Sequence, residues 1–300
     1  MLDPAVIPAE PFDESRAGAV DRSSRRVTRE QLRFLSRSWA FRVGAALLLF
    51  WVGCAIFGGF LAPEDPLAQD LLSANQAPSG AHLFGTDSLG RDVFSRVITG
   101  SRSVLIVAPI ATLLGTVLGT ILGLAQGHYR GPVDAITGRL VDAFLALPYV
   151  MLLFLFLVAL GSSRASLILI ISCFYGIVIS RTVRAAVLQE TELEYVAAAR
   201  LRGEGSLYTM FVEILPNVRP IIIVEFAVRL GYAIFAVATL SYLGFGIQPP
   251  TPDWGADISA NAQLLSAGYW WQTLFPALAI ASLISAVNMI DDSVAKAVIE

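Results

Sequence analysis

Charged residues are scarce in this chain. They make up 15% of its 300 residues, against 55% hydrophobic residues, and the mean hydropathy is +0.66. Soluble domains usually carry about 25% charged residues. The shortage of charge excludes an ordinary soluble domain and indicates an integral membrane protein.

The residue types that carry nucleotide and metal chemistry are also few. Lys296 is the only lysine and stands in an Ala-Lys-Ala context, so the chain lacks the G-x-x-x-x-G-K-[ST] loop whose lysine reaches nucleotide phosphates. His82 and His128 are isolated and outside the apolar runs, whereas Cys54 and Cys173 fall inside them. We therefore assign no catalytic residue, cofactor, metal site or disulfide, and we expect that the chain is not an enzyme.

Six apolar stretches predict transmembrane helices. A helix needs about 20 apolar residues to cross the hydrocarbon core of a bilayer, and these stretches lack the alternation of barrel strands. We therefore expect an all-α membrane protein with six transmembrane helices. The stretches are 43–62, 104–126, 143–163, 165–180, 220–246 and 258–290.

The arginines are distributed unevenly around these spans. Six arginines and one acid lie between residues 22 and 37, whereas loop 247–270 has no arginine or lysine. Because basic flanks stay in the cytoplasm, both termini are expected inside, an N-in/C-in topology. The expected parts are a partly disordered cytoplasmic tail (1–38), a first transmembrane helix (39–62), an extracytoplasmic loop (63–101), a five-helix core (102–292) with a cytoplasmic loop (182–217), and a cytoplasmic C-terminus (293–300).

The cytoplasmic loop is predicted to form two short helices separated by a glycine turn. Thr191 and Glu194 have the spacing of a capping box, and Gly203 stands where a helix commonly ends. A second helix is expected over about 207–215. Pro216 is expected to mark the turn into the fifth span.

The first of these short helices has a narrow apolar face. Leu193, Ala197 and Leu201 fall on one stripe at helical spacing. Such a face either packs on the chain itself or docks into a groove of a soluble partner. The residue pattern alone leaves both interpretations open.

Two features lie inside the predicted spans. Glu225 and Arg229 have the favourable i,i+4 order for an ion pair. Because intramembrane charges are candidates for function, the pair is either structural or lines a translocation path, for which a zwitterionic peptide would be a suitable passenger. Glycines also recur at every fourth residue, a spacing that lets helices pack closely, and we expect this stripe to pack inside the bundle. These glycines are Gly115, Gly119, Gly123 and Gly127.

The extracytoplasmic loops carry aromatic and charged clusters. The aromatic residues are expected to form a belt at the membrane interface, and a short helix is expected near 92–98 at the outer surface. Asp87, Arg91 and Asp92 are expected to pair with one another. The aromatic residues are Trp254, Tyr269, Trp270 and Trp271.

One motif of the cytoplasmic loop resembles a signature of permease subunits of bacterial ABC importers. Ala198-Ala199, then Gly203, then Ile214-Leu215-Pro216 are similar to the EAA…G…I-LP motif, which in that family forms the coupling helix that fits a cleft in the ATPase subunit. Ala197 stands where the motif has its acid, and Glu194 lies one turn earlier. The ATPase-coupling residues that the resemblance implies are Glu194, Ala197, Ala198, Ala199, Gly203, Ile214, Leu215 and Pro216.

Further motifs resemble the dipeptide/oligopeptide/nickel branch of this family. Residues 84–92 read FGTDSLGRD, residues 240–246 read LSYLGFG, and Pro-Pro-Thr-Pro follows at 249–252. The similarity covers roughly residues 40–292 in the expected order, and besides Ala197 the tail after Asp292 also diverges. It implies the type I permease core with a cytoplasmic coupling helix, in a bacterial plasma (inner) membrane.

The resemblance also implies a set of partners and a passenger. The partners are a second homologous permease, usually as a heterodimer, one or two ABC ATPase subunits, an extracytoplasmic substrate-binding protein and the lipid bilayer, without nucleic acid. ATP is hydrolysed in the partner subunits, and the passenger is a di- or oligopeptide, with nickel complexes or another peptide-sized ligand as alternatives.

Two other classes of function fit the sequence less well. An ion-coupled secondary transporter usually has several intramembrane acids and two matching halves, whereas this chain has the single Glu225–Arg229 pair and no visible repeat. An intramembrane hydrolase needs an H-E-x-x-H motif or a histidine at membrane depth. The sequence has no such motif, and both histidines lie outside the predicted spans. Both classes leave the docking helix unexplained.

Overall fold

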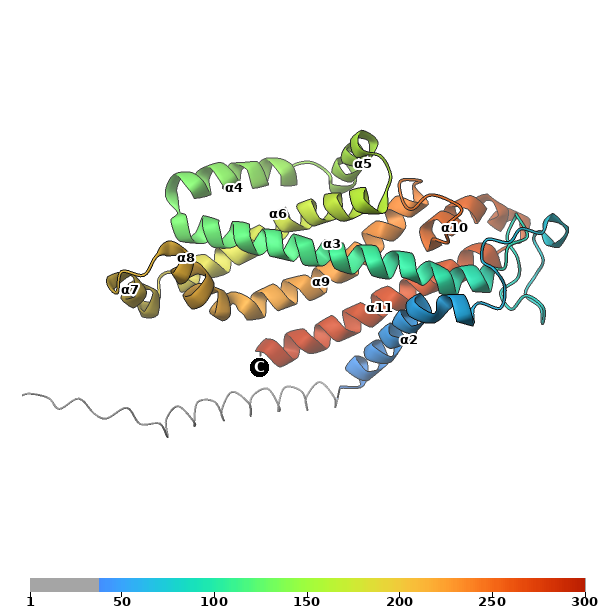
Figure 1. The fold of residues 1–300 in the computed structure, drawn as a ribbon, viewed down its shortest axis with the longest axis horizontal. Helices are drawn as coiled ribbons and strands as arrows, with labels where there is room; N and C mark the ends of the chain where they lie inside the picture. The colour runs from blue at the N-terminus through green and yellow to red at the C-terminus, as the bar shows by residue number, and fades with distance from the viewer. Residues whose placement is uncertain (1–37, 300) are drawn as a thin grey trace, which may run out of the picture.

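The chain folds into a bundle of long helices (Figure 1). A computed structural model describes residues 38–299, and within that range the named elements are all helical. The longer helices are α2 (Trp39–Leu61), α3 (Val93–Tyr129), α4 (Gly131–Leu145), α5 (Tyr149–Leu160), α6 (Arg164–Glu190), α9 (Leu215–Tyr242) and α11 (Trp271–Ile299). The shorter ones are η1 (Leu71–Ser73), α7 (Glu194–Leu201), α8 (Ser206–Tyr208), η2 (Thr209–Ile214), α10 (Trp254–Asn261) and η3 (Ala262–Ala267).

Five described helices are long and apolar enough to cross a membrane: α2, α3, α6, the continuous stretch Ser206–Tyr242, and α11. The predicted span 143–163 is not a single helix, because α4 and α5 are bent by 93° at a short break. Pro148 explains the break, since proline has no N–H and disfavours helical backbone at the residue before it. At 12 residues α5 alone is too short to cross a membrane. The predicted span 143–163 therefore exists only as the bent α4–α5 pair, which brings the number of described spans from five to at most six.

The central seam of the bundle joins α3 to α6, which run parallel to each other. The predicted glycine stripe of α3 faces α6, and a Cβ atom added at any of the four glycines would lie less than 3.0 Å from an α6 atom. The prediction that the stripe packs inside the bundle is therefore confirmed. From the first glycine to the last, the nearest atoms are Ser172 O at 2.9 Å, Gly176 O at 2.7 Å, Val183 Cβ at 2.7 Å and Val187 Cγ1 at 2.6 Å.

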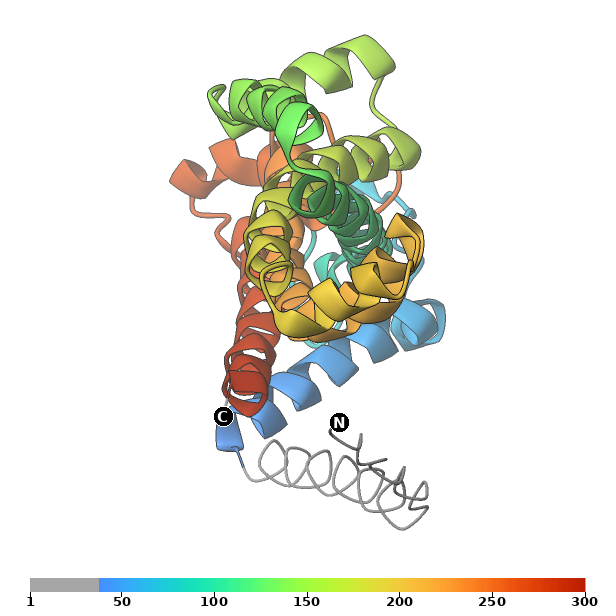
Figure 2. The same ribbon diagram turned by 90° about the vertical axis from the view of Figure 1, so that its left-hand side faces the viewer.

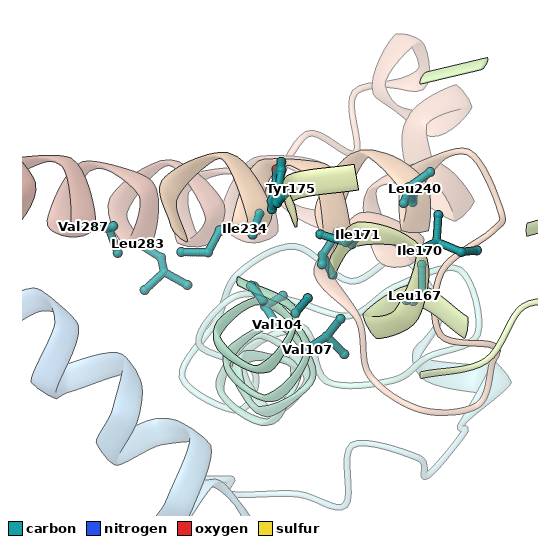
Figure 3. Packing of buried hydrophobic residues seen from close by; sticks show 14 of the residues in the cluster. Val104, Val107, Leu167, Ile170, Ile171, Tyr175, Ile234, Leu240, Leu283 and Val287 are labelled. Carbon is teal, nitrogen blue, oxygen red and sulfur yellow. The ribbon is translucent and has the colours of Figure 1, made fainter. Parts of the chain in front are cut away.

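Branched apolar side chains fill the space beside this seam. Figure 3 shows Val104 and Val107 of α3 close to Leu167 and Ile171 of α6, with Ile234 of α9 next to them, and all five are buried. Because lipid tails are as apolar as these side chains, close van der Waals packing stabilises the contact more than removal from solvent does.

Buried tryptophans connect distant segments at the end of the bundle that lies opposite α7. This end is called here the α10 end. Trp254 Nε1 donates to Val97 O at 2.7 Å, and Trp271 Nε1 donates to Thr86 O at 3.1 Å. These two rings are 0% and 6% exposed, whereas Trp270 is 46% exposed. The expectation of an interfacial belt is wrong for Trp254 and Trp271, because each buried indole N–H has a backbone acceptor inside the protein.

The charged residues just before α3 form an ion pair and a helix cap within the protein. Asp87 Oδ2 accepts from Arg91 Nε at 2.7 Å, so the expected pairing is confirmed for these two residues. Asp92 is the N-cap of α3, and its Oδ2 accepts from the Ser95 N–H at 2.8 Å. The helix expected near 92–98 is not separate, because α3 continues from there for 37 residues.

A second buried ion pair joins α3 to α10. Arg96 Nε donates to Asp257 Oδ1 at 3.1 Å. Nearby Asp253 caps α10, and its Oδ1 accepts from the Ala256 N–H at 3.1 Å. Burial raises the pKa of Asp253 to about 6, because a charged carboxylate is poorly solvated there.

We expect Gly119→Ala to destabilise the bundle. The added methyl group would lie 2.7 Å from Gly176 O and 2.8 Å from Ile179 Cβ, and overpacking of this kind costs roughly 1–3 kcal/mol. The readout is the thermal unfolding midpoint of the full chain in mild detergent. Gly59→Ala is the matched control, because no atom lies within 4 Å of an added Cβ there. Equal midpoints for the two variants would contradict the seam.

Replacing Asp253 by asparagine should alter how stability depends on pH. Since the folded pKa is about 6 and the unfolded pKa about 3.9, the folded state binds more protons between these values. The stability contribution is full below pH ~4 and lost as pH rises through ~6.

Asp253→Asn keeps a capping oxygen without the titrating proton. We therefore expect the variant to unfold at a higher temperature than the wild type at pH 8 and to differ little from it at pH 4. Asp65→Asn, at an exposed position, is the control. A wild-type advantage at pH 8 would show that the carboxylate is stabilised rather than strained.

Candidate functional site

The segment that carries the permease-like motif lies at one end of the bundle. Figure 1 shows α7 and α8 at the end opposite α10, and Figure 2 shows this end from the front, with α7 between the ends of α6 and α9. The motif therefore connects two of the long helices, α6 and α9, at the tip of the bundle. This tip is called here the α7 end.

The start of α7 differs from the prediction. Thr191 is the C-cap of α6, and its Oγ1 donates to Leu188 O at 2.9 Å. Leu193 is the N-cap of α7 and has no side-chain capping bond. The capping box predicted for Thr191 and Glu194 is wrong because α6 extends to Glu190, so the threonine side chain serves the end of the preceding helix. As a result α7 has 8 residues.

The end of α7 confirms the predicted role of Gly203 as a helix stop. Its φ is +78°, which glycine adopts without the steric cost that a Cβ atom adds. The Gly203 N–H donates to Arg200 O at 3.0 Å, and the Glu204 N–H donates to Ala199 O at 3.2 Å. This pair of bonds is the Schellman motif, and it fixes the direction in which the chain leaves α7.

The second short helix is continuous with the fifth span. The backbone passes from α8 through the π-helical turn η2 into α9, and the Leu215 N–H donates to Met210 O. Pro216 lies in the first turn of α9, where its missing N–H costs little because the turn before it is already widened. The prediction that Pro216 turns the chain is wrong, and one helix of 37 residues, Ser206–Tyr242, begins beside α7.

The implied coupling residues divide into a buried and an exposed set. Ala199 and Ile214 are 0% exposed, and Leu215 is partly buried. The exposed set is Glu194, Ala197, Ala198, Gly203 and Pro216. One side of the segment therefore packs on the chain, as the first interpretation of the apolar face expects, and the other side is exposed, so docking on that side stays a prediction.

The free side of α7 is apolar. Leu201 is 90% exposed and Leu193 is 48% exposed, whereas Val196 on the other side is 0% exposed. Leu193, Ala197 and Leu201 form the apolar stripe that helical spacing predicts. A short exposed stripe of this kind is what a helix presents to a groove.

Two side-chain contacts hold α7 to its neighbours. The Tyr195 hydroxyl donates to Glu190 Oε2 at 2.7 Å, which connects α7 to α6. Arg202 Nη2 donates to Glu213 Oε1 at 2.9 Å, which connects the turn after α7 to η2. Burial and the bond to Glu190 raise the pKa of Tyr195 to about 12, so the hydroxyl keeps its proton at neutral pH. Sequence reasoning missed both contacts, because no local pattern pairs these residues.

The two intramembrane charges of α9 form the predicted pair. Arg229 Nε donates to Glu225 Oε2 at 3.0 Å, and the guanidinium carbon lies 5.8 Å from the centre of the Tyr232 ring. Tyr232 also lines a cavity of about 360 Å³ between α9 and α11, together with Asn288 and Asp291. Sequence reasoning missed this polar cavity, although Asp291 directly follows the last apolar run.

The chain is similar to known transport proteins along most of its length. The pattern of the family described as "Binding-protein-dependent transport system inner membrane component" matches residues 115–300, and that of the "N-terminal TM domain of oligopeptide transport permease C" matches residues 27–78. The chain is 34% identical over 276 residues to the dipeptide transport system permease protein DppC of Bacillus subtilis, covering 92% of this chain and 86% of that protein. It is 35% identical over 262 residues to the glutathione transport system permease protein GsiD of Pectobacterium atrosepticum, covering 87% and 86%.

The division of α7 into two faces predicts which positions a thiol reagent reaches. In a chain with Cys54 and Cys173 replaced by alanine, we expect Ala198→Cys to react rapidly with a water-soluble maleimide. Ala199→Cys should react at least ~10-fold more slowly, because a 0% exposed side chain reacts only after local opening, which costs free energy. Labelling is followed by mass spectrometry of the full chain. Equal rates would place the two alanines on one face.

Proposed function

Because the chain belongs to the family of binding-protein-dependent transport system inner membrane components, we propose that it is the permease subunit of an ATP-driven importer of di- and oligopeptides. It is a multi-pass protein of the bacterial plasma membrane. The relatives that carry this proposal are named for dipeptide and glutathione transport. Nickel complexes or other peptide-sized ligands are the alternative passengers.

The observation that carries the proposal is the exposed apolar stripe of α7 at the tip of two long helices. The structure leaves Leu201 90% exposed, while the other side of the same short helix is packed. In the proposed complex the stripe fits a cleft of an ABC ATPase subunit, and Glu194 supplies an acidic contact at its edge. The coupling residues are then the exposed set of the motif, and the buried set holds them in place.

The mechanism follows from how α7 is attached. When two ATPase subunits close on ATP, they move α7, and the Schellman turn, Tyr195–Glu190 and Arg202–Glu213 transmit that displacement to α6 and α9. A packed bundle responds by rigid-body motion between two arrangements rather than by continuous deformation. ATP binding then shifts the balance between an outward-facing and an inward-facing state of the permease pair.

The remaining partners follow from the same proposal. ATP hydrolysis belongs to the ATPase subunits, a second homologous permease completes the path as a heterodimer, and a substrate-binding protein delivers the passenger at the α10 end. This arrangement places both termini and α7 in the cytoplasm and the α10 end outside. A peptide has an ammonium and a carboxylate group, and Glu225 and Arg229 offer one charge of each sign beside the polar cavity of α9 and α11.

Gly203→Pro should abolish transport by the assembled importer. Proline fixes φ near −65°, whereas Gly203 has φ +78° and uses its N–H in the Schellman turn. The final turn of α7 must then unfold, at a cost of roughly 3 kcal/mol or more. Uptake of a radiolabelled dipeptide into cells is the measurement, with the amount of the chain in the membrane checked by immunoblot.

Gly205→Pro is the matched control for this prediction. Gly205 has φ −70°, which proline adopts, so this variant should transport normally. The wild-type complex, extracted in mild detergent, should contain a P-loop ATPase and a second permease, and Gly203→Pro should lose the ATPase. Normal uptake by Gly203→Pro would argue against the coupling role, and a chain that purifies alone and transports without ATP would end the importer proposal.

A further inference from the structure

A cleft lies along one side of the first helix, whose other side packs on the bundle through Trp51 and Cys54. α2 touches its neighbours closely near its two ends, where Cβ atoms added at Gly58 and Gly44 would lie 3.4 Å from Thr99 and 2.7 Å from Ala286 O. Between these contacts a cavity of about 530 Å³ lies among α2, α3, α9 and α11. Its volume falls within the range of roughly 300–1,000 Å³ typical of ligand sites.

The lining of this cleft is apolar with one exception. Ten of its eleven lining residues are apolar, and the eleventh is Arg102. The apolar walls include Val52 and Ile56 of α2, Ile106 of α3 and Ile234 of α9. The occupant that fits such a lining is an amphiphile with a long apolar part and one anionic group.

Arg102 has no partner in the part of the chain that the structure describes. Its side chain is exposed, and no hydrogen bond or ion pair to it is found there. By contrast, Arg91, which lies just before α3, and Arg96, earlier on the same helix as Arg102, are both buried against aspartates. An unpaired guanidinium beside an apolar cleft in a membrane is costly unless an anion or the head-group region solvates it.

The position of Arg102 along α3 places it near a membrane surface. Thr99 faces Gly58, close to the end of α2 at Leu61, and Arg102 follows Thr99 by about one turn, or ~5 Å. Helical side chains lean toward the helix N-terminus, so the guanidinium points back toward the end of α2. Long arginine side chains at this depth reach the head groups.

We propose that this cleft is a binding site for an anionic phospholipid. One acyl chain occupies the cleft between α2 and the α3, α9 and α11 helices, and the phosphate group lies on Arg102. A guanidinium suits this role because its N–H donors match two phosphate oxygens at once. The bound lipid fills the space beside α2 and adds to the contacts that already hold this helix to the bundle.

Retention of lipid by the full chain tests the site. The chain is purified in mild detergent and mixed with phosphatidylglycerol or phosphatidylcholine of identical acyl chains, and native mass spectrometry counts the bound molecules. We expect the wild type to retain phosphatidylglycerol roughly fivefold better than phosphatidylcholine, because one arginine near an anionic lipid strengthens binding by a factor of about this size. Arg102→Gln should lose this preference.

Two further variants separate the cleft from general charge effects. Arg164→Gln removes another exposed arginine, at the start of α6 and outside the cleft, and should keep the preference. Ala55→Trp fills the cleft and should reduce retention of both lipids, with an unchanged elution volume showing that the chain stays folded.

The proposal is overturned if the wild type shows no preference, or if Arg102→Gln and Arg164→Gln behave alike. It is also overturned if a co-purified second permease displaces the lipid completely, because the cleft would then be a protein interface.

Discussion

The close approach of α3 to α6 is the contact on which the rest of the structure depends. Four glycines at one-turn spacing let the two backbones approach until no Cβ atom would fit between them. In a bilayer, where apolar burial alone does not favour helix association, such contact area is the main attraction between helices. The parallel course of α3 and α6 also decides where each ends, so α7 begins at the tip of the bundle and the α4–α5 pair must return along its side.

The two ends of the bundle are built differently. At the α10 end, several buried polar side chains bond to partners inside the protein, as Arg96 does with Asp257 and Trp254 with Val97. At the α7 end the apolar stripe around Leu201 has no counterpart in the described chain. The α10 end is therefore held by contacts within the chain, whereas the α7 end keeps an open apolar face, and the proposed docking of an ATPase subunit needs such a face.

The proposed coupling depends on the attachment of α7 to the long helices. Tyr195 and Arg202 fasten the short helix on two sides, and η2 carries the chain into α9 without a hinge. A docking helix on a loose loop would absorb a displacement. In the proposed mechanism, a helix that is fastened on both sides passes the displacement to α9, which carries the Glu225–Arg229 pair.

The sequence by itself determined the class of the protein, its apolar spans, the glycine seam and the stop at Gly203, because each depends on composition or on spacing within one helix. It also carried the family motif. Tertiary structure alone decided the rest. The break at Pro148 divides the predicted span 143–163 into the bent α4–α5 pair. The helix α6 extends to Glu190, so Thr191 caps its C-terminus instead of starting α7. Trp254 and Trp271 can be buried because backbone oxygens of distant segments accept from their indole N–H groups. Packing against neighbouring helices likewise decides that Ala198 faces outward and Ala199 inward. Periodicity names the residues that share a face, but only a neighbouring element decides which face is covered.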